Sequence, residues 1–228
     1  MTDSARKLLH LVQFCDSALP VGGFSFSATL ESAAGFGVVH DEPTLRSYAQ
    51  AAVNQSLMSD CIAAMHTLRE ARLEEALRAD RELTACKLSA EQRLMSTRMG
   101  RKLTELSLKL MPQQKILREW LKQLEQGATA GNHAIAQALV FEAMGLGERE
   151  LFVAHYYGTL SIILNAALRC IRISHLQTQQ MLHELSSQAD ELYPAVARLR
   201  LEQMQTSNPQ IDIFSSLHER GQMRMFMN

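Results

Sequence analysis

The sequence lacks the features that would place it in several familiar protein classes. Its four cysteines, Cys15, Cys61, Cys86 and Cys170, lie far apart and form no Cys-x-x-Cys pair, which argues against a zinc ribbon or a redox motif. We interpret them as small, buried apolar residues. Neither sign of charge is in excess, because 23 Lys and Arg residues stand against 24 Asp and Glu residues. No net field therefore favours nucleic acid or an anionic membrane.

A long hydrophobic run is also absent. The most apolar stretch, residues 160–173, is interrupted by Asn165, Arg169 and Arg172, whereas a bilayer needs about 20 consecutive apolar residues. The apolar segment that follows Arg6-Lys7 is broken by polar residues and shows no cleavage site of a signal peptide. We therefore expect a soluble, cytoplasmic protein that does not enter a membrane.

Alternating patterns long enough for a sheet are missing, whereas apolar spacings of three and four residues fill most of the chain. Asp41-Glu42-Pro43 is a good helix start, and Ser89 with Gln92 fits a capping box in which the two residues satisfy each other's backbone amides. Residues 151–173 are apolar on nearly all sides, as expected of a central helix. These patterns predict an all-α fold, a single-domain helical bundle of about eight to ten helices.

The predicted helical domain covers residues 1–207, and residues 208–228 are predicted to be a C-terminal tail used in partner docking. This last segment, "NPQIDIFSSLHERGQMRMFMN", follows neither the helical nor the strand period. Its Met-Arg-Met-Phe-Met ending fits a docking peptide, because these apolar side chains would otherwise be left exposed.

The stretch "LPVGGFSFSATLE", residues 19–31, interrupts the helical pattern. It has no lysine and so cannot be a phosphate-binding P-loop, and "GFGVVH" at 35–40 lacks the third glycine of a dinucleotide motif. Gly22-Gly23 fits either a plain turn or a break that brings the backbone close to another segment. No nucleophile elbow surrounds Ser25 or Ser27, so we expect their hydroxyls to stabilise the loop.

The eight histidines show no metal-ligand spacing. His175 and His183 are two helical turns apart, and Cys170 and His175 point in different directions around a helix, so neither pair can share an ion. Methionine-rich stripes are more often core or adaptable contact surface than soft-metal sites. We therefore predict no metal site, no cofactor and no catalytic residue, and hence a protein that is not an enzyme.

Five segments, in order, resemble the urease accessory protein F family. The first is "LPVGGFSFSATLE", which is similar to that family's opening motif Leu-Pro-[Val/Ile]-Gly-[Gly/Ala]-[Phe/Tyr]-Ser-x-Ser-x-Gly-Leu-Glu. The others are "STRMGRKL", "GNHAIAQALVFEAMGL", "SIILNAALRCIRIS" and "IDIFSSLHERGQMRMF". Together they span nearly the whole chain.

The resemblance implies a helical, non-enzymatic scaffold or chaperone that helps to insert nickel into apo-urease. It implies a homodimer that forms a GTP-hydrolysis-dependent complex with accessory protein D (also called H) and the accessory GTPase, protein G. In the family the glycine motif and the tail lie close together and help to recruit the GTPase. By match of position the partner-binding residues are Pro20, Gly22, Gly23, Phe24, Ser25, Ser27, Glu31, His218, Glu219, Arg224 and Phe226.

The chain departs from the family pattern at a few positions. Thr29 stands where the motif has glycine, Gln222-Met223 replace Tyr-Ser in the tail, Arg172 replaces a common proline and His175 a common glutamine. An alternative role is that the chain modulates the GTPase activity of protein G by lending Arg224, since an arginine can offset charge in phosphoryl transfer. A nickel-binding metallochaperone has little support from the ligand spacing.

Overall fold

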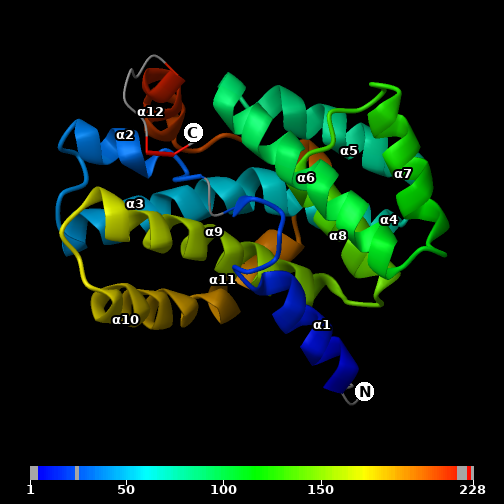
Figure 1. The fold of residues 1–228 in the computed structure, drawn as a ribbon, viewed down its shortest axis with the longest axis horizontal. Coiled ribbons are helices and arrows are strands. Elements are labelled where there is room, and N and C mark those ends of the chain that lie inside the picture. The colour runs from blue at the N-terminus through cyan, green and yellow to red at the C-terminus, as the bar shows by residue number, and fades with distance from the viewer. Residues whose placement is uncertain (1–4, 24–25, 220–224, 227–228) are drawn as a thin grey trace.

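The computed structural model describes residues 5–23, 26–219 and 225–226, and all regular secondary structure among them is helical, with no strand. The predicted all-α, single-domain bundle is therefore confirmed (Figure 1). The helices are α1 (Ala5–Cys15), α2 (Leu30–Gly35), α3 (Glu42–Ser56), α4 (Ile62–Glu70), α5 (Leu73–Cys86), α6 (Ala90–Leu110), α7 (Lys115–Glu125), α8 (His133–Ala143), α9 (Glu148–Cys170), α10 (His175–Ser186), α11 (Ala189–Ala197) and α12 (Pro209–Glu219). A π-helical turn, η2 (Leu57–Cys61), joins α3 to α4, and a 3-10 turn, η3 (Leu201–Gln203), follows α11.

Helix α9 is the central helix, as the sequence predicts. It crosses the middle of the molecule and packs against α1, α2, α3, α4, α10 and α11 (Figure 1). By length and composition alone it is apolar enough to span a membrane, but 56% of its most apolar window is buried inside the protein. Its apolar surface is thus used to hold the bundle together.

Among the described residues, α6 and α8 form the most extensive contact between two helices. Gly100 on α6 faces the loop before α8, where an added Cβ would overlap the carbonyl oxygen of Gly131. The buried Asp80 on α5 fixes this loop, because its carboxylate accepts hydrogen bonds from the backbone amides of Gly131 (2.9 Å) and Asn132 (2.7 Å). Glycine at position 100, which has no side chain, thus permits the close contact between α6 and the loop before α8.

Two predicted helix starts differ in outcome. Asp41 caps α3 as expected, and its partner in the capping box is Thr44. Ser89 accepts a hydrogen bond from the Gln92 amide at 3.0 Å, but the predicted reciprocal bond is wrong. The Gln92 side chain instead donates to Asp212 on α12 at 3.1 Å, because a distant helix offers it a carboxylate.

Three further features differ from the sequence patterns. Pro194 lies inside α11, although proline usually ends a helix, and the apolar positions from Met181 to Leu192 are divided between α10 and α11. Helix α1 leaves apolar side chains exposed to solvent, at Leu8 (51%) and Val12 (65%). Residues 209–219, within the predicted tail, form helix α12, which packs on α2 and α6.

Candidate partner-docking site

The glycine turn lies between α1 and α2, against α6 and α9. Gly22 has a φ of +89°, which favours glycine, whereas a Cβ added at Gly23 would make ordinary van der Waals contact, 3.4 Å from Met99 Cε. Pro20 is exposed at the start of the turn. Of the two interpretations left open by the sequence, the plain turn therefore describes Gly22, and the space around Gly23 does not require a glycine.

The second half of the motif holds two residues with positive φ, Ala28 (49°) and Thr29 (65°). This left-handed conformation explains why the resembled motif has glycine at position 29. Thr29 is buried, and its hydroxyl lies 2.6 Å from the Tyr48 hydroxyl, which itself donates to the Ala28 carbonyl oxygen at 2.6 Å. The phenol has a single proton, so Thr29 is the donor in the first of these bonds. The hydroxyl pair thus stabilises a conformation that a threonine does not favour.

Glu31, in the first turn of α2, joins this motif to the end of the chain. One carboxylate oxygen accepts a hydrogen bond from the backbone amide of Met225 at 2.7 Å, and the other accepts from the amide of Phe226 at 3.2 Å. The second oxygen also lies 2.9 Å from Nε2 of His218 on α12. Beneath it, the buried Ser27 hydroxyl accepts from the Glu31 amide at 3.4 Å. One side chain therefore contacts three parts of the C-terminal segment.

Helix α12 is seated on α2 and α6 through polar side chains (Figure 1). His218 is 4% exposed, and its Nδ1 lies 2.7 Å from a carboxylate oxygen of Glu91 on α6. Glu219 accepts a hydrogen bond from the Glu91 backbone amide at 3.2 Å. Glu91 lies in the first turn of α6, where the helix dipole also attracts a carboxylate. The hydroxyls of Ser215 and Ser89 are 2.5 Å apart.

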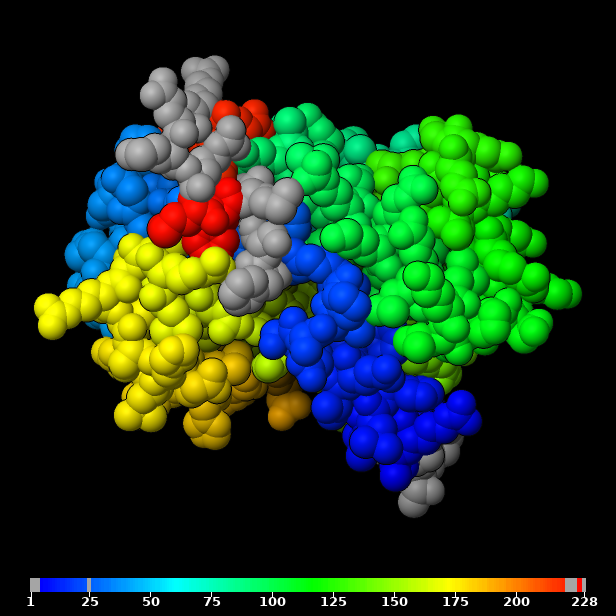
Figure 2. Space-filling model, viewed as in Figure 1, coloured from blue at the N-terminus to red at the C-terminus, as the bar shows by residue number. Residues whose placement is uncertain are grey.

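Phe226 is buried, and its ring lies beneath the Arg169 guanidinium of α9, 3.9 Å from the ring centroid. A guanidinium over an aromatic face is an attractive contact. Figure 2 shows residues 225–226, in red, on the same face of the molecule as the blue segment that ends at residue 23. Both chain segments singled out by the resemblance therefore reach one face.

The structure brings four of the predicted residues together, namely Glu31, His218, Glu219 and Phe226. Phe24, Ser25 and Arg224 lie outside the described residues, so their contacts stay predictions. Glu91, Arg169 and Tyr48 complete the arrangement and were not predicted. No spacing rule finds them, because each meets the motif or the tail across more than 15 residues of sequence.

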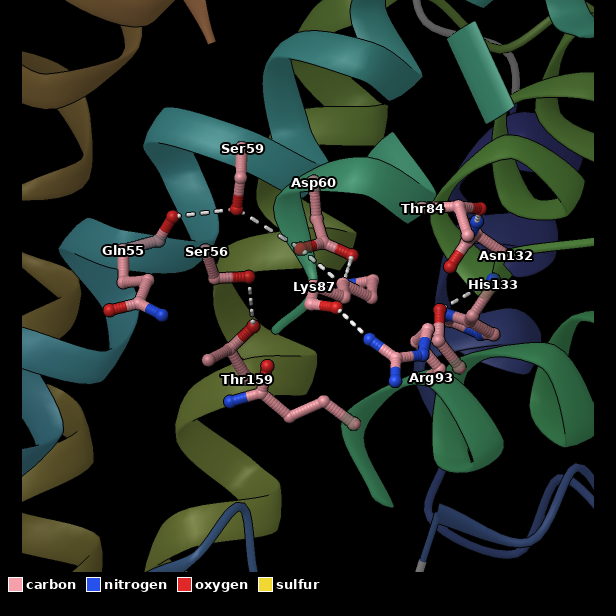
Figure 3. Close-up of polar contacts among 12 residues, drawn as sticks. Gln55, Ser56, Ser59, Asp60, Thr84, Lys87, Arg93, Asn132, His133 and Thr159 are labelled. Carbon is pink, nitrogen blue, oxygen red and sulfur yellow. Dashed lines mark hydrogen bonds and ion pairs between the residues drawn. The ribbon is translucent and has the colours of Figure 1, made fainter. Parts of the chain in front are cut away.

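A cavity of about 260 Å³, whose lining is more apolar than polar, lies beside this region, among α3, η2, α6, α8 and α9. Asp60 and Lys87 point toward each other in it, with the Lys87 ammonium 2.7 and 2.8 Å from the two carboxylate oxygens, and Ser56 faces Thr159 (Figure 3). Burial alone would raise the pKa of Asp60, but the Lys87 ammonium, together with smaller contributions from His155 and Ser59, outweighs burial and holds that pKa below its usual value.

Two histidines line the same cavity. Burial lowers the pKa of His133 to about 4, and burial also lowers the pKa of His155, whose Nε2 lies 2.7 Å from the Ser56 hydroxyl. Both rings are therefore neutral at pH 7. Among the residues that the structure describes, no three His, Cys, Asp or Glu side chains converge as a metal centre would need. The polar side chains of this largely apolar cavity are thus an ion pair, hydroxyl groups and neutral imidazoles.

Exposed apolar side chains lie on α12 and on the segments next to its contacts with α2 and α6. Helix α12 carries Ile213 and Leu217, and the end of the chain carries Met225. Leu88 lies just before α6, and Leu94 lies near the start of that helix. Single exposed apolar residues are ordinary, but a group of them beside a polar node is typical of a protein-protein contact surface. We call this group, with Glu31, His218 and Phe226, the α12 surface.

Comparisons with known proteins give one consistent result. The sequence model described as UreF matches residues 39–186. Urease accessory protein UreF 1 of Brucella melitensis is 43% identical over 224 residues, which cover 97% of this chain and 92% of that protein. Urease accessory protein UreF of Yersinia enterocolitica is 37% identical over 228 residues, which cover 99% of this chain and 100% of that protein.

Proposed function

The chain belongs to the UreF family of urease accessory proteins, and from this we propose that it is a scaffold or chaperone required for incorporation of the nickel metallocentre into urease. It acts in the cytoplasm in a complex with accessory protein D (H), the accessory GTPase protein G and apo-urease. Hydrolysis of GTP belongs to protein G, and nickel is the cargo of the complex. The chain itself catalyses no reaction.

The α12 surface is the proposed docking site for accessory protein D. The observation that carries this proposal is the position of Glu31, which binds the chain end at His218, Met225 and Phe226. This node presents Ile213 and Leu217 outward beside it. An apolar core with a polar rim is the usual anatomy of a specific interface.

We also propose that the protein is a homodimer and that α1 contributes to the dimer contact. Leu8, Leu9 and Val12 form an exposed apolar group on this helix, which projects from the bundle (Figure 1). Burying such side chains stabilises an interface by roughly 25 cal/mol per Å² of apolar area before the costs of association. A second copy is the partner that supplies an equivalent group.

Capture of purified accessory protein D tests the docking site. Ile213 is 56% exposed, so Ile213→Asp introduces a charge into the α12 surface without filling or emptying the core. Leu176→Asp on α10 is the matched control, since Leu176 is 68% exposed and lies on another helix. We expect Ile213→Asp to weaken capture at least about tenfold, which corresponds to about 1.4 kcal/mol, and Leu176→Asp to leave it unchanged.

Urease activation in cells that lack the native protein provides the functional readout. We expect the Leu176→Asp chain to restore activation and the Ile213→Asp chain to fail. Phe24→Ala and Arg224→Ala are also expected to reduce activation, which extends the test to the remaining predicted residues. Normal nickel loading of urease in the absence of this protein would refute the proposed function, and equal capture of both aspartate variants would refute the docking site alone.

A further inference from the structure

The solvent-facing side of α6 is basic. Arg98, Lys102 and Lys109 are exposed, and their spacing of four and seven residues places them in one line along the helix. Arg101, also exposed, flanks this line, and the exposed Leu94 lies at its start. From residue 94 to residue 109 the helix extends about 22 Å. We call Arg98, Arg101, Lys102 and Lys109 the α6 basic face.

Few acidic groups neutralise the α6 basic face. Arg101 is paired with Glu105, whose carboxylate oxygen lies 2.9 Å from Nε. The other three cations form no ion pair with any residue that the structure describes. The exposed carboxylate of Glu219, beyond the start of α6, already accepts a hydrogen bond from the Glu91 amide. The face is thus a local excess of positive charge on a chain whose formal net charge is −1.

The α6 basic face adjoins both segments of the candidate site. The Lys102 ammonium lies beside the glycine turn, because a Cβ added at Gly22 would be 3.6 Å from Nζ. Helix α12 packs on α6 near the start of that helix, where Leu94 belongs to the α12 surface (Figure 1). The α6 basic face therefore continues the α12 surface along the helix. A protein bound across the α12 surface would meet these cations next.

We propose that the α6 basic face receives an acidic surface of the protein that docks on the α12 surface. The proposal rests on the proposed function, because it extends the docking site assigned there. An acidic protein surface fits this face better than nucleic acid does, because Leu94 adds an exposed apolar contact and the whole chain has no excess of positive charge. Exposed charges at the rim of an interface act mainly on the association rate, since they attract the partner before contact.

Association kinetics of the full-length protein with purified accessory protein D measure this effect. The test variant combines Arg98→Gln, Lys102→Gln and Lys109→Gln, which remove three charges at exposed positions and keep residues that favour helix. In 0.1 M salt we expect its association rate constant to be about tenfold below that of the wild type, with little change in the dissociation rate constant. In 1 M salt the two proteins should associate at similar rates, because the screening length falls from about 10 Å to about 3 Å.

A triple variant of α7 is the matched control. It combines Lys115→Gln, Arg118→Gln and Lys122→Gln, which also remove three exposed positive charges, so the two variants have the same net charge. We expect this variant to associate with accessory protein D as fast as the wild type in 0.1 M salt. Equal slowing of the two variants would overturn the proposal, because net charge and not the α6 basic face would then set the rate.

Two further outcomes distinguish this proposal from its alternatives. If the wild type binds accessory protein D and the α6 variant associates at the wild-type rate, the α6 basic face has no such role, although the docking site still holds. If the wild type does not bind accessory protein D at all, the docking site and this extension of it both fail. Labelled duplex DNA is the second probe, and salt-sensitive binding that only the α6 variant loses would overturn the assignment to an acidic protein surface.

Discussion

Replacing Gly100 with alanine should destabilise the protein although alanine is the better helix former. The added Cβ would overlap the Gly131 carbonyl oxygen and lie 2.9 Å from both the Asn132 carbonyl carbon and the His133 nitrogen. All three are backbone atoms, so α6 and the loop before α8 would have to move apart. Relief by rotation of a side chain is not available at this contact.

The magnitude follows from three opposing effects. Alanine gains about 1 kcal/mol over glycine in a helix interior. Overpacking costs about 1–3 kcal/mol, and a contact made only with backbone belongs at the upper end. Moving Gly131 and Asn132 also strains their hydrogen bonds to the buried Asp80, each of which is of the charged kind that contributes about 1.5–3 kcal/mol. We expect a net loss of about 3 kcal/mol, and a melting temperature lower by about 6–12 °C for a chain of this size.

Gly158→Ala is the matched control, because Gly158 lies inside α9 and an added Cβ there would meet no atom within 4 Å. This change should stabilise the protein by up to about 1 kcal/mol. Urea denaturation followed by circular dichroism measures both variants against the wild type. A Gly100→Ala protein as stable as the wild type would refute the claim that this glycine sets the distance between α6 and α8.

Two other predictions concern the motif and the cavity. Thr29→Gly should change the free energy of unfolding by less than about 1 kcal/mol, because relief of the positive φ offsets the lost bond to Tyr48. Thr29→Val keeps the strain but loses the hydroxyl, so it should lower the free energy of unfolding by about 1–3 kcal/mol. Equal stability of the valine variant and the wild type in urea titrations would contradict this reasoning. Burial lowers the pKa of His133 to about 4, so between pH ~6.5 and 4 the unfolded chain binds more protons than the folded one and stability falls as the pH decreases. We expect a loss of about 2 kcal/mol by pH 5 in urea titrations and a smaller slope in His133→Gln, and an identical slope in that variant would count against the assignment.

Sequence periodicity predicted the helices whose buried face is apolar. The central helix α9 and the capped start of α3 followed directly from their patterns, because an apolar stripe reports the side of a helix that faces the core. Helix α12 was missed for the same reason. Its buried face carries Asp212, Ser215 and His218, which interrupt the apolar period and resemble the pattern of a solvated segment.

The candidate site was predictable only through the family resemblance. Composition and spacing left Gly22-Gly23 open between a turn and a close backbone approach, and left His218 open between a ligand and a partner contact. The contacts that define the site join Glu31, Glu91 and His218 from three separate helices, and hydrophobic spacing does not report which distant polar groups meet. The sequence patterns gave Glu91 no role, and yet its carboxylate contacts His218 near the other end of the chain.

The contact between Glu31 and His218 spans 187 residues of sequence. During synthesis the helices from α2 to α11 emerge from the ribosome before α12, so the carboxylates of Glu31 and Glu91 are hydrated until the last turn of helix arrives. A chain truncated before the last turn of α12 would lack His218 and therefore could not form the complete α12 surface. Assembly with other proteins would thereby be restricted to molecules whose translation has passed this point.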